Sequence, residues 1–150
     1  DSKVGFKVGL GGNDIVGPVN VYDSVFYDNL QGGFHFHADA DGPALVERCI
    51  AYGHTGVDDY GFQLDGSLGE AGFDRQINSS IAYNNYEGIH LYQYNFNADM
   101  ELYNNTIYGS EYGIYIETHG SQNRPLGHEL YNNIFSDSEY GLFCENETDA

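Results

Sequence analysis

The sequence predicts an all-β fold, a right-handed parallel β-helix (β-solenoid) of about six coils that occupies the single domain 1–150. Short runs rich in Val, Ile, Tyr and Phe alternate with Gly, Asn and Asp, which is typical of strands joined by turns. A motif of glycine, an apolar residue, any residue and a second apolar residue recurs along the chain. Its glycines lie 25 to 28 residues apart, and several short strands in a repeat of that length indicate a solenoid.

The glycine motif predicts the first strand of each coil. Its six instances begin at Gly5, Gly33, Gly61, Gly88, Gly113 and Gly141. In a solenoid each strand pairs with the same strand one coil further on, at a spacing of about 4.8 Å, so equivalent residues stack in columns. We expect one inward column at the residue after the glycine, formed by Phe6, Phe34, Phe62, Ile89, Ile114 and Leu142.

A second pattern between the glycines predicts two more strands separated by a bend. It consists of an apolar residue, two variable residues, a small polar residue and a mostly apolar one. The apolar positions expected in the core are Val46, Ile50, Ile77, Ile81, Leu102 and Leu130. The small residues at the bend are Ser24, Cys49, Ser80, Asn105 and Asn133. Stacked amides and hydroxyls can satisfy each other's hydrogen bonds, so we expect a polar ladder at this bend.

The two cysteines are not expected to form a disulfide. Cys49 and Cys144 lie in coils three steps apart, which is roughly 14 Å at the strand spacing. A disulfide needs Cα atoms within about 7 Å of each other. The repeat therefore predicts two free, mostly buried thiols.

The charge balance limits the classes of partner. The chain carries 5 Lys and Arg against 23 Asp and Glu, a net charge of −18. Such a surface repels nucleic acid and anionic membranes, so neither is an expected partner. It attracts cations, with calcium the first candidate because calcium prefers oxygen ligands. Simple solubility in salty surroundings is the alternative explanation of the charge.

Strand alternation predicts where chemistry would occur. The residue between two inward residues points outward, which gives one outward column of Lys7, His35, Gln63, His90, Tyr115 and Phe143. Two residues further on, a second column holds Gly9, His37, Asp65, Tyr92, Glu117 and Glu145. Insertions that follow this strand would wall the face into a groove, and solenoids usually carry their function on such a face. The residues expected to line a ligand are His35, His37, Gln63, His90, Tyr92 and Tyr115.

The segment from Gly5 to Gly9, followed by Gly11, Gly12 and Asn13, resembles the Gly-Phe-Lys-Leu-Gly-Gly segment of family 9 polysaccharide lyases. These enzymes are β-helical pectate lyases. The coils around residues 33–34, 49–53 and 104–108 are also similar to that family in their repeat pattern. The resemblance implies that Lys7 is the base that removes the proton at C5 of a uronate, while calcium neutralises the adjacent carboxylate.

Acidic loops supply candidate calcium ligands. The residues are Asp39, Asp41, Asp58, Asp59 and Asp65. His35 and His37 share one face with Asp65 nearby, a donor set that would also suit a transition metal. The family's calcium-binding aspartates precede the lysine, whereas here only six residues precede Lys7.

Two functions from different classes remain open. The first is a secreted, extracellular or cell-surface β-helix that binds or cleaves an acidic, uronate-containing polysaccharide by calcium-assisted β-elimination. The second is a non-catalytic structural module that stacks end to end in a filament, or on neighbouring coils of a longer protein. One observation favours the second, since no capping segment is apparent beside Val4 or after Cys144.

Overall fold

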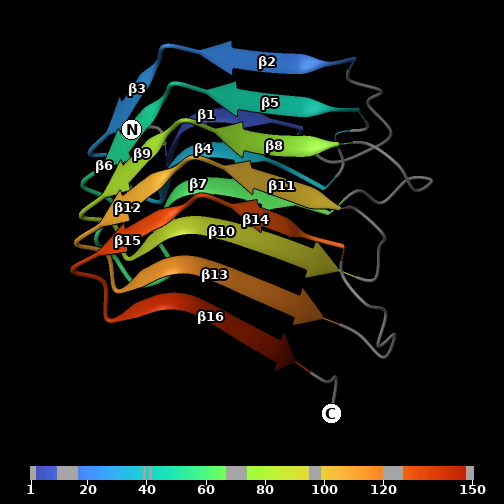
Figure 1. Cartoon of the computed structure of the whole chain (residues 1–150). Coiled ribbons are helices and arrows are strands. Elements are labelled where there is room, and N and C mark those ends of the chain that lie inside the picture. The colour runs from blue at the N-terminus through green and yellow to red at the C-terminus, as the bar shows by residue number, and fades with distance from the viewer. Residues whose placement is uncertain are drawn as a thin grey trace.

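The computed structural model describes residues 3–9, 17–38, 40, 42–66, 74–94, 99–119 and 127–147, and these form sixteen strands in three parallel sheets (Figure 1). The first sheet contains β1 (Val4–Val8), β4 (Gly32–Phe36), β7 (Tyr60–Asp65), β10 (Glu87–Tyr94), β13 (Tyr112–His119) and β16 (Tyr140–Glu147). The second contains β2 (Val19–Tyr22), β5 (Ala44–Glu47), β8 (Arg75–Asn78), β11 (Met100–Tyr103) and β14 (Glu129–Tyr131). The third contains β3 (Val25–Tyr27), β6 (Ile50–Tyr52), β9 (Ile81–Tyr83), β12 (Thr106–Tyr108) and β15 (Ile134–Ser136).

The chain passes through the second, third and first sheets in turn, and each passage makes one coil. Five coils of three strands follow the single strand β1, so the described chain has slightly fewer than the six predicted coils. Each strand pairs in parallel with its counterpart one coil away, as expected for a parallel β-solenoid. The part of the chain that the structure describes contains no helix suited to crossing a membrane.

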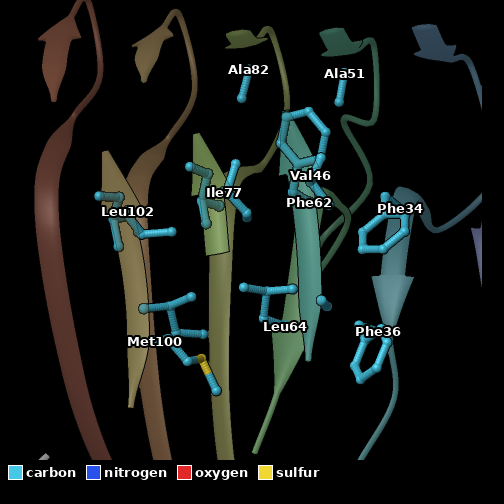
Figure 2. Packing of buried hydrophobic residues seen from close by; sticks show 14 of the residues in the cluster. Phe34, Phe36, Val46, Ala51, Phe62, Leu64, Ile77, Ala82, Met100 and Leu102 are labelled. Atoms are coloured by element: carbon cyan, nitrogen blue, oxygen red, sulfur yellow. The ribbon is translucent and has the colours of Figure 1, made fainter. Parts of the chain in front are cut away.

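The core lies between the three sheets (Figure 2), and the first sheet supplies its largest side chains. Phe34 pairs in register with Phe62, which pairs with Ile89, as the glycine motif predicted. Phe34 and Phe62 have no exposed surface. Val46, Ile77 and Leu102 approach them from the second sheet, as Figure 2 shows. The inward column of the first sheet is therefore confirmed over its central coils, together with these second-sheet positions.

In the third sheet, the residue that points into the core lies one position later in the sequence than predicted. Ala51, Ala82 and Ile107 occupy the middle of their three-residue strands and point into the core. Ile50 and Ile81, which were expected in the core, point outward, and Ile81 is 36% exposed. The apolar residue next to the bend is therefore an outward residue.

The outward surface of the third sheet carries a ladder of tyrosines. Tyr27, Tyr52, Tyr83 and Tyr108 stack with ring centroids 4.7 to 5.5 Å apart. Their planes are within 10° of parallel. The sequence carries this column as a tyrosine at the second residue after the bend's apolar or threonine residue, in four of the five coils.

The bend between the second and third sheets has a fixed geometry. Its first residue adopts a left-handed conformation, with φ between 50° and 57° in all five coils. These residues are Asp23, Arg48, Ser79, Asn104 and Asn132. The next residue forms the expected polar ladder, in which the backbone amide of Ser80 donates to Asn105 Oδ1 at 3.0 Å. Asn105 repeats this contact with Asn133 Oδ1 at 3.1 Å.

Both cysteines are free, as predicted, but only Cys49 is buried. The expectation of a buried Cys144 is wrong. Cys144 lies on β16, which pairs with β13 on one side and with no described strand on the other. Its neighbour Leu142 is 50% exposed for the same reason.

Candidate functional site

The two outward columns of the first sheet form in the predicted register. Lys7 lies beside His35, His35 beside Gln63, and Gln63 beside His90. The column continues through Tyr115 to Phe143. In the second column Asp65, Tyr92, Glu117 and Glu145 are also neighbours. Parallel in-register stacking thus brings together residues that are about 28 positions apart in the chain.

The expectation that these columns are exposed is wrong at their centre. His35, Gln63, Asp65 and His90 are each at most 9% exposed. Their side chains contact one another or neighbouring carboxylates instead of extending into water. A buried polar group is stable only when such partners satisfy it. The face therefore contains two buried polar clusters, and Lys7 lies exposed at one end.

The His35 cluster consists of Tyr60, His35, Gln63 and Asp65. Asp65 Oδ2 lies 3.0 Å from His35 Nε2, and Asp65 Oδ1 accepts from Gln63 Nε2 at 2.6 Å. Since a carboxylate only accepts, His35 carries its proton on Nε2, and Nδ1 accepts the Tyr60 hydroxyl at 3.2 Å. Burial lowers the pKa of His35, and Asp65 offsets this only in part. At neutral pH the ring is uncharged and held in one tautomer.

The His90 cluster consists of Glu87, His90 and Glu117. Glu87 Oε2 lies 2.9 Å from His90 Nδ1, and Glu117 Oε2 lies 3.1 Å from Nε2. Burial alone would lower the pKa of His90, but the two carboxylates outweigh burial and raise it to about 9. His90 is therefore an imidazolium at neutral pH, whereas His35, with one carboxylate, is neutral.

The raised pKa of His90 makes the stability of the folded protein depend on pH. A histidine whose pKa is raised on folding stabilises the native state fully below its unfolded pKa of 6.5. That stability is lost as the pH rises through about 9. The difference between the folded and unfolded pKa values corresponds to a loss in the free energy of unfolding on the order of 3 kcal/mol. Urea denaturation at pH 6 and pH 10 should show this loss, and His90→Gln should reduce it. An unchanged free energy of unfolding in the wild-type chain would contradict the assignment.

The structure places the expected ligand-lining histidines and tyrosines around these clusters. The ring of His37 is half-buried and lies 5.3 Å from that of His35. Tyr92 and Tyr115 pack against His90 with ring centroids 5.9 and 5.1 Å away. Tyr115 also donates its hydroxyl to Glu145. All six residues expected to line a ligand are therefore on one face.

The candidate metal ligands that the structure describes, Asp58, Asp59 and Asp65, do not belong to a group of three that could hold a metal ion. Asp39 and Asp41 lie outside the described residues. Asp59 Oδ2 accepts the Gly56 amide at 2.8 Å, an interaction internal to its own turn. Asp65 already contacts His35, Gln63 and the backbone amide of residue 38. No three His, Cys, Asp or Glu side chains within the described ranges are arranged to hold a metal ion, so the alternative site at His35, His37 and Asp65 is not formed.

A pocket of about 260 Å³ opens beside the His90 cluster. Its lining residues are Asp58, Tyr86, Glu87, Tyr112, Tyr115, Phe143 and Glu145. Sequence analysis had named Asp58, Tyr115, Phe143 and Glu145, but it missed Tyr86, Glu87 and Tyr112, together with Tyr60. Tyr60, Glu87 and Tyr112 are stacked neighbours that each precede a motif glycine. Simple alternation would point that position inward, but Tyr60 turns toward His35 across Gly32. A Cβ on Gly32 would be only 2.2 Å from the Tyr60 ring, so this turn needs glycine there. The recurrence of large polar residues before the glycine was the available signal.

Comparison with known proteins agrees with the architecture. The family described as "right handed beta helix region" matches residues 9–135. No curated protein and no solved structure matches the chain. The family match covers most of the chain and agrees with the three parallel sheets. The chain belongs to the right-handed β-helix family.

Proposed function

We propose that the chain is a carbohydrate-active β-helix whose first sheet binds an acidic, uronate-containing polysaccharide along its outer face. The observation that carries the proposal is the in-register row from Lys7 through His35, Gln63 and His90 to Tyr115. Its side chains recur at the strand spacing of about 4.8 Å. His35, Gln63 and His90 are buried and order this face, while the exposed Lys7 and the ring of Tyr115 are the groups that can contact an extended sugar chain.

The proposed reaction is β-elimination with Lys7 as the base. The uncharged amine of Lys7 takes the proton from C5 of a uronate. The electron pair of that C–H bond forms the C4–C5 double bond, and the C4–O bond breaks. The departing sugar oxygen then takes up a proton. Lys7 is exposed and its strand neighbour is the neutral His35, so substrate can reach the base.

Calcium is the proposed cofactor. The C5 proton is only weakly acidic until the adjacent carboxylate is neutralised, and a bound cation supplies that neutralisation. A cation is also needed to bring a polyanion to a protein with a net charge of −18. Its candidate ligands remain Asp39, Asp41, Asp58, Asp59 and Asp65, and an extracellular or cell-surface location would supply the ion.

The experiment is an assay of polygalacturonate cleavage by the wild-type chain, followed by the ultraviolet absorbance of the unsaturated product. We expect product with millimolar calcium and none with a chelator. Magnesium at the same concentration is the control for ionic strength. If no product forms in calcium at any pH from about 7 to 10, the range in which a lysine can act as a base, the lyase proposal fails.

End-to-end stacking is the second candidate function. It is supported by inward side chains that are uncovered on both end coils, Phe6 at 44% exposed and Leu142 at 50%. A further parallel coil, from a second copy or from the same protein, would bury them. Sedimentation that gives a monomer at every concentration would count against self-association.

A further inference from the structure

The pocket beside the His90 cluster differs in charge from the rest of the proposed binding face. Three of its seven lining residues are carboxylates, Asp58, Glu87 and Glu145, and none is Lys or Arg. A uronate placed here would meet like charge. The row at Lys7, several strands away, instead presents a cation. The His90 imidazolium offsets the charge of Glu87, but Asp58 and Glu145 keep the pocket acidic, so it favours a ligand of opposite charge.

Aromatic rings form the other walls of the pocket. Tyr115 and Phe143 stack with centroids 5.6 Å apart, and Tyr112 packs against both at 5.3 and 5.1 Å. Tyr86 extends this cluster, with its ring 5.5 Å from that of Tyr112. Aromatic faces bind ammonium groups through the ring quadrupole and also pack against sugar rings.

Glu87 is a buried carboxylate at the pocket wall. Its side chain is 4% exposed, and its Oε2 lies 2.9 Å from His90 Nδ1. That contact pairs the carboxylate with the His90 ring. Glu87 also lines the pocket, so it contributes a carboxylate to that wall. Glu145 is exposed and already accepts the Tyr115 hydroxyl, but a carboxylate has capacity for further donors.

The three carboxylates are not arranged for a single metal ion. A ligand with its charge on a larger organic frame fits better, since it can place the cation at one wall and a ring against the others. From the pocket's acidic lining and aromatic walls, we propose that it binds an amino sugar with a free primary ammonium group, of the glucosamine type. This proposal does not depend on Lys7 or on cleavage.

Calorimetric titration with the β-linked glucosamine disaccharide tests the proposal, with its N-acetylated counterpart as the neutral control. At about 0.15 M salt, which screens non-specific attraction, the charged disaccharide should bind at least about tenfold more tightly, the gain expected from a desolvated cation on aromatic rings. Equal binding of the two sugars would overturn the proposal. Tighter binding of a tri-lysine peptide than of the amino sugar would also overturn it.

The chain offers a matched pair of variants. Glu145→Gln removes a carboxylate that accepts a tyrosine hydroxyl at the pocket. Glu129→Gln removes one that accepts the Tyr103 hydroxyl at 3.0 Å on the second sheet. We expect Glu145→Gln, and also Phe143→Ala, to weaken binding of the charged disaccharide about tenfold. Glu129→Gln should leave binding within about twofold, since rim charges away from a site contribute little. Equal effects of the two Gln variants would indicate non-specific attraction and would contradict binding of the disaccharide in the pocket. Lys7→Ala should leave this binding unchanged, so failure here is separable from failure of the lyase proposal.

Discussion

Replacing Phe62 with alanine is expected to lower the free energy of unfolding by about 3–5 kcal/mol. Phe62 has no exposed surface and is stacked between Phe34 and Ile89 in the central coils. The edge of Phe26 also contacts it, with ring centroids 6.4 Å apart. Coils on both sides hold the backbone in place, so the cavity cannot collapse easily. Urea denaturation of the two proteins measures the difference.

Ile81→Ala is the control for Phe62→Ala. Ile81 is also apolar and also lies in the central coils, but it points outward from the third sheet. Its truncation should cost less than about 1 kcal/mol, as for other exposed positions. A similarly small cost for Phe62→Ala would mean that the central column is not the core.

Lys7→Ala is expected to abolish cleavage of polygalacturonate while leaving binding nearly intact. A general base acts on the transition state, so its removal lowers kcat much more than it changes substrate affinity. Lys7→Arg should be inactive as well, because a guanidinium stays protonated and cannot accept the C5 proton. Cleavage rates and binding of an uncleaved oligogalacturonate, measured on the same preparations, separate the two effects.

Lys3→Ala is the matched control for Lys7. Lys3 is also exposed, immediately precedes β1 and carries the same charge, but it lies outside the outward column. Its loss should leave cleavage unchanged. If Lys7→Ala keeps its activity, or if Lys3→Ala loses as much, then Lys7 is not the base.

Much of the fold could be predicted because every coil of a solenoid pairs its strands in the same register as the coil before it. Stacked strands place equivalent residues in columns, so the spacing of the glycine motif alone gave the register from Lys7 to Phe143. The stacking of coils also excluded a disulfide. The predicted inward orientation of Ile50 and Ile81 was wrong because a three-residue strand has only one inward position. The adjacent bend decides which residue takes that position.

The candidate site was predicted less completely, since its properties depend on contacts between columns. The sequence placed His35 and His90 on one face but could not show that both are buried with carboxylates. Glu87 was missed because it lies at the position where strand alternation breaks down. The buried Arg75, which donates to the Ala40 carbonyl at 2.7 Å and lies over Phe36, likewise had no periodic signal.

The position of a bound oligogalacturonate tests the central proposal most directly. Nuclear magnetic resonance of the wild-type chain, titrated with tetragalacturonate in the presence of calcium, reports contacts residue by residue. The proposal predicts that the largest shifts occur at Lys7, His35, His37 and Gln63 on the outer face of the first sheet. Shifts confined to the tyrosine ladder of the third sheet, or no shifts with calcium present, would contradict it.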